Sequence, residues 1–333
     1  MKSTNASASA FWWDFQSNAA IMLMLKNIKI ATAVKVEGEK EDIEITLDNG
    51  NTIYSQAKSV FDPYNDFNNV IAKLKAGLKT LNSVGNIENV AQLIYITNSA
   101  NPFNKQETMG AFSGSLTSLK YSELPDSCRQ QVDELCVAEG YSFDKNLFSV
   151  YVMQFHGDGE NRYKVVKDLA NEFLNSVGLG ERGLGQAMLE IWQRWFTINS
   201  SQHNLSLSIS KKSMIWPLIV SICEVNAEDA LLSDFDEGDV DQIIGRYKSI
   251  IDNNSERFQF VTKVLSAYNS FGINLKGSER IKSFVSKHWQ DFSGEFDIQS
   301  VEIDLIEPIV KLAVSNVIRR HRNIVRIKGE VNL

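Results

Sequence analysis

The sequence has little cysteine and no long hydrophobic run. Its 333 residues include three cysteines, with no short spacing of the kind that zinc sites use. This pattern favours a reducing compartment without a disulfide framework. The apolar stretch 19–25 is followed by a lysine and is too short to span a bilayer. No secretory signal is evident, so we expect a cytoplasmic protein with no membrane partner.

Positive charge is also in short supply. The chain has 34 Lys and Arg against 41 Asp and Glu, a net charge of −7, which excludes a surface that is basic throughout. Any contact with nucleic acid therefore needs a local basic patch, or one assembled by oligomerisation or a partner. A basic cluster near the end of the chain predicts contact with phosphates or with an acidic partner surface. Alternatively, it complements the dipole of a helix C-terminus. Its members are Arg319, Arg320, Arg322 and Arg326.

The length and the apolar content predict a globular protein of two domains. Hydrophobic residues make up 43% of the chain and aromatic residues 10%, enough for a sizeable core. We place the boundary after residue 158, so that a mixed α/β domain (1–158) precedes an all-α domain (159–333) that oligomerises or docks a partner. The helical stretches expected from apolar periodicity are 163–176, 186–198, 212–225, 239–251, 256–268, 281–289 and 303–322.

A predicted β-hairpin carries the main chemical signal. Two apolar runs, 43–47 and 52–60, are joined by Asp48-Asn49-Gly50-Asn51. Asn-Gly between such runs is a strong hairpin signal, because both residues tolerate the positive φ of a tight turn. The second strand carries Gln56 and Lys58 at i and i+2, on one face of the sheet.

Acidic and amide oxygens gather beside this lysine. Asp42, at the start of the first strand, can reach the face that carries Gln56 and Lys58. A hard cation such as Mg²⁺, or Mn²⁺, takes carboxylate and carbonyl ligands, here Asp42, Gln56 and the backbone oxygen of Ala57. Lys58 would orient or deprotonate a water molecule, or balance charge on a phosphate. The group predicts metal-assisted phosphodiester hydrolysis. A surface hairpin with a solvated acidic cluster is the alternative.

The flanking pattern places this hairpin within an α-β-β-β-α-β order. The expected elements around it are a helix at 11–26, a strand at 28–37, a helix at 65–81 and a strand at 92–97. A polar, glycine-containing stretch at 98–117 predicts a loop over the active-site side of the sheet. A helix at 126–138 and a strand at 147–155 would close the domain.

Within residues 8–98 the chain resembles the PD-(D/E)xK, or restriction-endonuclease-like, nucleases. It looks most like the double-stranded-DNA nuclease domain of CBASS and related antiphage effectors. The segments that carry the resemblance are Trp13-Asp14-Phe15-Gln16, Val36-Glu37-Gly38, Glu41-Asp42-Ile43-Glu44-Ile45 and Gln56-Ala57-Lys58-Ser59. Two features depart from the family pattern: the glycine that usually opens the first segment is absent, and the acidic segment is one residue longer.

The resemblance implies a role for each matched residue. Asp42 would be the metal-binding acid, Gln56 would occupy the second acidic position, and Lys58 would be the catalytic lysine. Glu37 is a candidate for an extra carboxylate, and Gln16 would support the site from the first helix. The longer acidic segment leaves open whether Asp42 or a neighbouring acid, Glu44, holds the metal.

The resemblance also implies a biological setting. It predicts a Mg²⁺-dependent endonuclease that cleaves double-stranded DNA as the effector of a bacterial antiphage system, acting as a homo-oligomer. By analogy of architecture, the chain would be the nuclease subunit of a Lamassu-type complex, held silent by an SMC-like ATPase partner. The alternatives are a non-catalytic DNA-binding or scaffolding subunit, and an RNase or nicking enzyme on the same fold.

Overall fold

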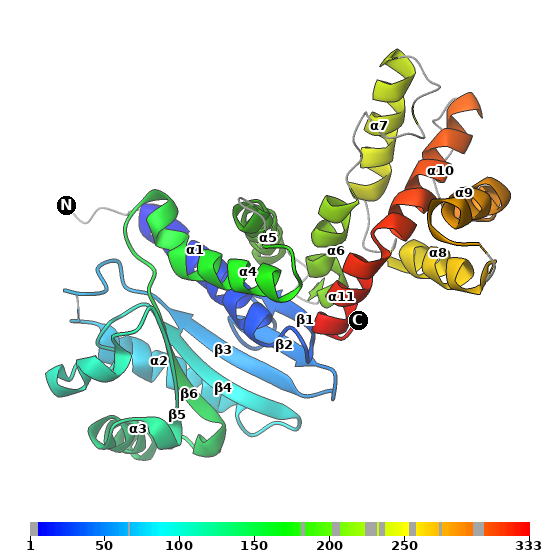
Figure 1. The fold of residues 1–333 in the computed structure, drawn as a ribbon. Coiled ribbons are helices and arrows are strands. Elements are labelled where there is room, and N and C mark those ends of the chain that lie inside the picture. Colours follow the sequence, from blue (N-terminus) through cyan, green and yellow to red (C-terminus); the bar gives the residue numbers. More distant parts are fainter. Residues whose placement is uncertain are drawn as a thin grey trace. The chain divides into compact units, whose positions relative to one another are not determined.

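A computed structural model divides the chain into two compact units, residues 1–211 and 212–333. It describes residues 6–65, 67–180, 184–201, 207–223, 232, 237–252, 258–272, 275–295 and 303–333. The expected helix ends at Val225 and Glu256 lie outside these ranges. The fold is mixed α/β, with one seven-stranded sheet and with helices concentrated towards the C-terminus (Figure 1).

The sheet belongs to the first unit and runs in the order β5-β6-β4-β3-β2-β1-β7. Its strands are β1 (Ala31–Val36), β2 (Ile43–Leu47), β3 (Thr52–Lys58), β4 (Val90–Thr97), β5 (Leu116–Lys120), β6 (Phe148–Met153) and β7 (Ile209–Ser210). Strands β3, β4 and β6 are parallel, whereas β1, β2 and β3 form an antiparallel meander. The helix α1 precedes this meander, and α2 links β3 to β4, so the element order is the expected one. A restriction-endonuclease-like core stays a prediction.

The hairpin between β2 and β3 forms where Asn-Gly predicted it. Ile43 pairs with Ser55, and the turn closes through a hydrogen bond from the Leu47 N–H to the Asn51 carbonyl at 2.8 Å. Of the two turn residues, Gly50 alone has a positive φ, of 81°. Glycine therefore supplies the left-handed backbone, while the Asn49 side chain accepts a bond from the Asn51 N–H.

Two helices cover one face of the sheet: α2 (Val70–Val84) and α3 (Asp126–Glu139) (Figure 1). Leu74, Leu78 and Leu81 of α2 join a core with side chains of β3, β4 and β6. The approach of α2 to β4 is close, because a Cβ built on Gly77 would lie 2.6 Å from the ring of Tyr95. Gly77 thus permits the close packing of α2 on β4.

Three helices cover the other face: α1 (Ala6–Lys26), α4 (Lys164–Ser176) and α5 (Leu184–Ser200) (Figure 1). Residues 15–25 of α1 are buried all round, because the sheet lies below them and α4 and α5 lie above. Polar contacts join the layers: Gln193 donates to Asn18 at 2.8 Å, and Tyr163 donates to Asp14 at 2.9 Å. Because α4 and α5 complete this core, the first unit extends to residue 211, beyond the boundary expected after 158.

The loop expected at 98–117 contains a 3-10 helix and the first two residues of a strand. Within residues 98–117 a 3-10 helix, Gln106–Phe112, precedes β5, which pairs with β6 along the sheet edge from Leu116↔Met153 to Lys120↔Ser149. The short stretch Leu-Thr-Ser-Leu-Lys has too few apolar residues to predict a strand. The backbone hydrogen bonds with β6 therefore stabilise this strand, which its local sequence does not predict.

The second unit is helical, as expected. Its helices are α6 (Lys211–Ile222), α7 (Glu237–Asp252), α8 (Phe258–Ser270), α9 (Gly277–His288), α10 (Ile303–Arg319) and α11 (His321–Val331), with the 3-10 helix η6 (Trp289–Glu295). Helix α10 contacts α7, α8, α9, α11 and η6, and is buried along 312–318. The unit is thus organised around α10 (Figure 1).

Candidate functional site

The end of the β1–β2 hairpin brings two carboxylates together. The Glu37 N–H donates to the Asp42 carbonyl at 2.8 Å, and the Gly38 N–H donates to the Glu41 carbonyl at 3.0 Å. Glu37 has a φ of 53°, a left-handed conformation that is strained for a residue with a side chain. Such strain concentrates at functional sites, where the surrounding structure maintains it.

Asp42 pairs with Lys58 across the neighbouring strands. Lys58 Nζ lies 3.0 Å from Asp42 Oδ2, and the Ala57 N–H donates to the same oxygen at 3.0 Å. Lys58 is the last residue of β3, so its ammonium lies at the sheet end beside the start of β2. The hairpin therefore joins the predicted acid and lysine in an ion pair.

Gln16 of α1 supports both carboxylate residues from above the sheet. Its Nε2 donates to Glu37 Oε1 at 2.6 Å and to the Asp42 carbonyl at 3.0 Å. Burial raises the pKa of Glu37, and the nearby charge of Asp42 adds to this effect, while the bond from Gln16 opposes it. The resemblance implies a supporting role for Gln16, and this role stays a prediction.

These side chains line a cavity of about 330 Å³. It is lined by Ser9, Trp12, Trp13, Gln16, Glu37, Asp42, Ala57, Lys58, Ser59 and Lys73. We call it the N-terminal cavity. Trp12 and Trp13 are 52% and 44% exposed at its edge, which is unusual for such large apolar side chains.

Gln56 lies beneath the cavity wall rather than on it. It is 3% exposed and donates from Nε2 to Oε2 of Glu41, which is equally buried. Burial raises the pKa of Glu41 to about 8, against the opposing effect of the Gln56 bond. Among the described residues, neither Glu41 Oε1 nor Gln56 Oε1, both buried, has a hydrogen-bond partner. Gln56 and Lys58 were expected to contribute to one site. Gln56, however, precedes Lys58 by two positions along β3, lies deeper in the core, and pairs with Glu41.

Glu44 lies outside the cavity and stabilises the loop before β2. Its Oε1 accepts bonds from the Lys40 N–H at 2.8 Å and from the Glu41 N–H at 3.3 Å. A Cβ on Gly38 would lie 2.4 Å from the same oxygen, so the carboxylate depends on a glycine there. Of the two acids that the sequence left open, Asp42 is the one that faces the cavity.

The residues that face the cavity suit a hard divalent cation. Within the described ranges, no three His, Cys, Asp or Glu side chains converge as a metal site. Mg²⁺, however, is commonly bound through one or two carboxylates with water as the remaining ligands. Glu37 and Asp42 supply two carboxylates, and the described residues give no donor to Asp42 Oδ1 or Glu37 Oε2. The Ala57 N–H donates to Asp42, and the role of the Ala57 carbonyl as a metal ligand stays a prediction.

Several residues of the site gave no signal in the sequence. Lys73, on the exposed side of α2, donates to the Ser59 carbonyl and lies 5.8 Å from the Trp12 ring centroid. Asn98, at the end of β4, accepts from the Val60 N–H at 2.7 Å and donates to the Val60 and Phe155 carbonyls at 2.8 Å each. It fixes the chain that follows Lys58. Both contacts join segments that are distant in the sequence.

The predicted basic cluster divides between two environments. Arg319 lines a second cavity, within the second unit, whereas Arg320, Arg322 and Arg326 are exposed around the junction of α10 and α11. None of the four lines the N-terminal cavity. Their contact with nucleic acid or a partner stays a prediction.

Comparisons with known proteins identify no family. No protein-family model and no curated protein matches the sequence. A solved structure of the Acinetobacter baumannii Cap4 SAVED/CARF-domain containing receptor, with the cyclic trinucleotide 2'3'3'-cAAA, is similar at 11% identity and a TM-score of 0.39. The match covers 63% of this chain and 44% of that one. At these values it establishes neither a shared fold nor a shared function.

The helices of the structure can be compared with the length and hydropathy that a membrane span requires. No helix in the described part of the chain is both long and apolar enough to cross a bilayer.

Proposed function

We propose that the protein is a Mg²⁺-dependent endonuclease that hydrolyses phosphodiester bonds of double-stranded DNA in the N-terminal cavity. The observation that carries the proposal is the Lys58–Asp42 ion pair, at 3.0 Å, on the wall of a cavity that Glu37 also lines. An ammonium and two carboxylates at one accessible point are the groups that metal-assisted hydrolysis of a phosphate ester requires.

Each residue has a distinct task in this proposal. Asp42 and Glu37 would hold the cation, which when bound would activate a water molecule and polarise the phosphate. Lys58 places its positive charge where negative charge develops on the phosphate oxygens in the transition state. Gln16 is a positioning residue, because it holds Glu37 and the Asp42 backbone through hydrogen bonds.

The walls of the cavity support a nucleic-acid substrate. Lys58 and Lys73 provide positive charge for the phosphate backbone, and the exposed rings of Trp12 and Trp13 provide surfaces for sugars or bases. The choice of double-stranded DNA, and the role in antiphage defence, rest on the resemblance of residues 8–98 to nuclease domains of that kind. A homo-oligomeric active form and an SMC-like partner rest on the same analogy.

One observation favours a second candidate, a nucleic-acid-binding subunit without catalysis. Gln56, which occupies the second acidic position of the resemblance, lies beneath the cavity and bonds to Glu41. A site with one fewer ligand would still attract phosphates through its lysines. The two candidates differ in whether bound DNA is cut.

The test measures cleavage and binding together. Purified protein is incubated with supercoiled plasmid, linear duplex and RNA in Mg²⁺, Mn²⁺ or EDTA, and binding is followed by fluorescence anisotropy. We expect metal-dependent cleavage of DNA, reduced about 10²–10³-fold in Lys58→Ala. Lys79→Ala, a change at an exposed lysine of α2 outside the cavity, is the matched control.

Three outcomes would change the assignment. If the protein binds DNA but does not cut it in any metal, and is harmless to cells that express it, the non-catalytic binding subunit is favoured. Cleavage of RNA alone would replace the substrate. Full metal-dependent activity in Lys58→Ala would contradict the site.

A further inference from the structure

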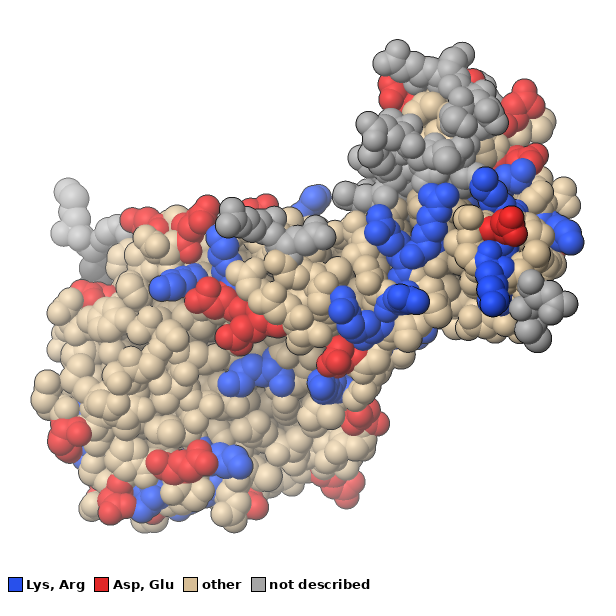
Figure 2. Space-filling view, in the orientation of Figure 1, with Lys and Arg blue, Asp and Glu red and all other residues tan. Residues whose placement is uncertain are grey.

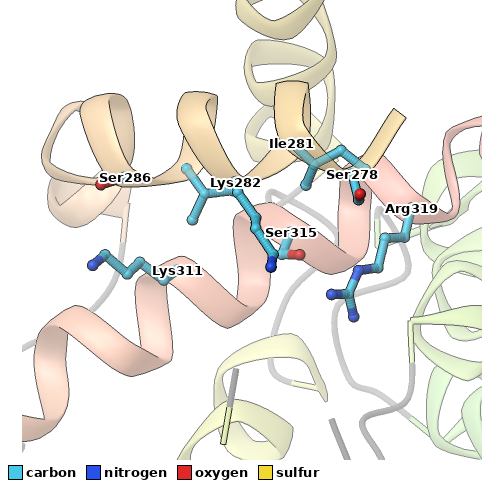
Figure 3. A pocket seen from close by; sticks show the side chains of 8 residues that line it. Ser278, Ile281, Lys282, Ser286, Lys311, Ser315 and Arg319 are labelled. Atoms are coloured by element: carbon cyan, nitrogen blue, oxygen red, sulfur yellow. The ribbon is translucent and has the colours of Figure 1, made fainter. Parts of the chain in front are cut away.

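The second unit contains a cavity of about 280 Å³ between α9 and α10 (Figure 3). Six polar side chains line it: Ser278, Lys282 and Ser286 from α9, and Lys311, Ser315 and Arg319 from α10. We call it the C-terminal cavity. In the close view, Lys282 extends from α9 across α10 beside Ser315, and Arg319 points to the same side (Figure 3).

The six residues form two matched rows. On α9 the order is Ser-Lys-Ser at positions 278, 282 and 286, and on α10 it is Lys-Ser-Arg at 311, 315 and 319. Each row has a spacing of four, which places its members on one helix face. Because both rows line one cavity, the packing of α9 on α10 brings three cations and three hydroxyls together.

The lining is positive. None of the described residues that line the cavity is acidic, and the nearest carboxylate in the sequence of α10, Glu307, pairs with Lys311 one turn away. No carboxylate among the described residues forms an ion pair with Lys282. In the space-filling view, Lys and Arg side chains gather over the region of α9 and α10 (Figure 2). Like charges held together repel each other, and a bound anion would remove this repulsion.

The cavity also has an apolar part. Ile281 and Val285, on the same face of α9 as its polar row, complete the lining, and the accessible apolar surface belongs mainly to the partly exposed Ile281, since Val285 is buried. A bare inorganic anion would leave this surface without a contact, whereas an organic ring would cover it. The volume is near the lower end of the range for small-molecule sites, about 300–1,000 Å³.

We propose that the C-terminal cavity binds a small organic phosphate with an apolar ring, such as a nucleoside diphosphate. Lys282, Lys311 and Arg319 contact the phosphate oxygens, and the serine hydroxyls donate hydrogen bonds to them. The ring lies against Ile281 and Val285. A nucleic-acid duplex is a poorer fit, because its bases are stacked inside the helix and would leave the apolar part of the lining without a contact. The site is independent of the proposed nuclease activity.

The test is calorimetric titration of the full-length protein with ADP and with inorganic pyrophosphate, in EDTA. We expect saturable binding of both, with ADP binding more tightly because its ring covers the apolar part. Lys282→Ala should weaken ADP binding about tenfold or more, as expected for loss of a charged hydrogen-bond donor. Arg322→Ala removes an exposed cation of the same unit outside the cavity and should change little.

The melting temperature of each variant without ligand checks its folding. Because Lys282 is exposed, Lys282→Ala should leave this temperature unchanged. Three results would overturn the proposal: no saturable binding of ADP, equal ADP affinity in the wild type and Lys282→Ala, or binding of pyrophosphate without ADP. A short DNA duplex that competes with ADP in a Lys282-dependent manner would also contradict it, because the surface would then recognise a nucleic-acid backbone.

Discussion

The two cavities of this protein contain lysines in opposite electrostatic settings. In the N-terminal cavity, Lys58 forms an ion pair with Asp42, and Glu37 adds a second carboxylate. In the C-terminal cavity, Lys282, Lys311 and Arg319 share a lining without an acidic residue among those described, although Lys311 also pairs with Glu307, which lies outside the lining. The first arrangement suits a cation and a reacting phosphate together, whereas the second suits a phosphate that is held and not cleaved.

The comparison teaches that the acids, rather than the lysines, distinguish the two cavities. Lysine serves phosphate binding and phosphate chemistry equally well, since its ammonium attracts negative charge in either case. A carboxylate beside it repels a phosphate unless a cation lies between them. Removal of an acid from the N-terminal cavity, or addition of one to the C-terminal cavity, therefore tests this difference.

The largest effect is expected when the N-terminal cavity loses its central acid. Asp42→Ala removes the partner of Lys58 and one of the two proposed metal-binding carboxylates, so cleavage should fall about 10²–10³-fold. Unlike Lys58→Ala, this variant should recover part of its activity at high Mg²⁺, because it weakens metal affinity. Plasmid cleavage across a Mg²⁺ titration measures the difference, with Glu39→Ala, at an exposed acid of the same loop, as the control. Identical Mg²⁺ curves for Asp42→Ala and Lys58→Ala would refute this division of roles.

The second change gives the C-terminal cavity an acid. Lys282→Glu places a negative charge among the proposed phosphate contacts, and like-charge repulsion should weaken ADP binding about a hundredfold or more. The loss should exceed that of Lys282→Ala, because repulsion adds to the missing contact. Calorimetry compares both variants with Arg322→Glu, which alters the net charge equally at an exposed position outside the cavity. Equal losses in Lys282→Glu and Arg322→Glu would mean that net charge alone governs binding.

The buried acid beneath the N-terminal cavity, Glu41, should make the stability of the protein depend on pH. Folded protein holds a proton on Glu41 up to a pKa of about 8, whereas the unfolded chain releases it near 4.5. Between these values unfolding releases a proton, so wild-type stability falls as pH rises, by about 1.4 kcal/mol per pH unit. A glutamine at position 41 does not titrate, so the unfolding free energy of Glu41→Gln relative to that of the wild type should increase from pH 5 to pH 8.

Urea denaturation at pH 5, 6.5 and 8 measures this pH dependence. Glu39→Gln, an exposed acid in the same loop, should follow the wild type throughout. A constant difference in unfolding free energy between Glu41→Gln and the wild type across this range would show that Glu41 does not titrate as the structure indicates.

The smallest effect is expected for the acid outside the cavity. Glu44→Ala removes two bonds to loop N–H groups and should lower the unfolding free energy by about 1 kcal/mol, with little change in cleavage. Thermal denaturation and the plasmid assay test the two parts, with Thr46→Ala, an exposed change on the same strand, as the control. A loss of cleavage as large as that of Asp42→Ala would make Glu44 the metal-binding acid after all.

Much of the N-terminal cavity could be predicted because its determinants are local. The Asn49-Gly50 turn sets the β2–β3 pairing, and β2 spans the expected residues, Ile43–Leu47. That pairing brings Asp42 to Lys58. A turn signal and strand alternation depend on residues a few positions apart, so they are visible without the rest of the fold.

Other features depended on contacts between distant segments. Alternation places Gln56 and Lys58 on one face, but it does not show that Gln56 lies deep enough to pair with Glu41. Strand β5 forms because β6 offers an edge, and α4 and α5 join the first unit because α1 is apolar on all sides. Each outcome depends on how much surface a neighbouring element covers, a quantity absent from local sequence patterns.

The C-terminal cavity shows the same division most simply. The sequence by itself indicated most of the two rows, because a spacing of four places Lys282 and Ser286 on one face of the helix expected at 281–289, and Lys311, Ser315 and Arg319 on one face of the helix expected at 303–322. Ser278 joins its row because α9 begins earlier than expected, at Gly277. Tertiary structure alone decided that these faces meet, because the burial of α10 among its neighbouring helices fixes its rotation against α9. Helix periodicity is a local property of the backbone, whereas the pairing of two helix faces is a property of the packed core.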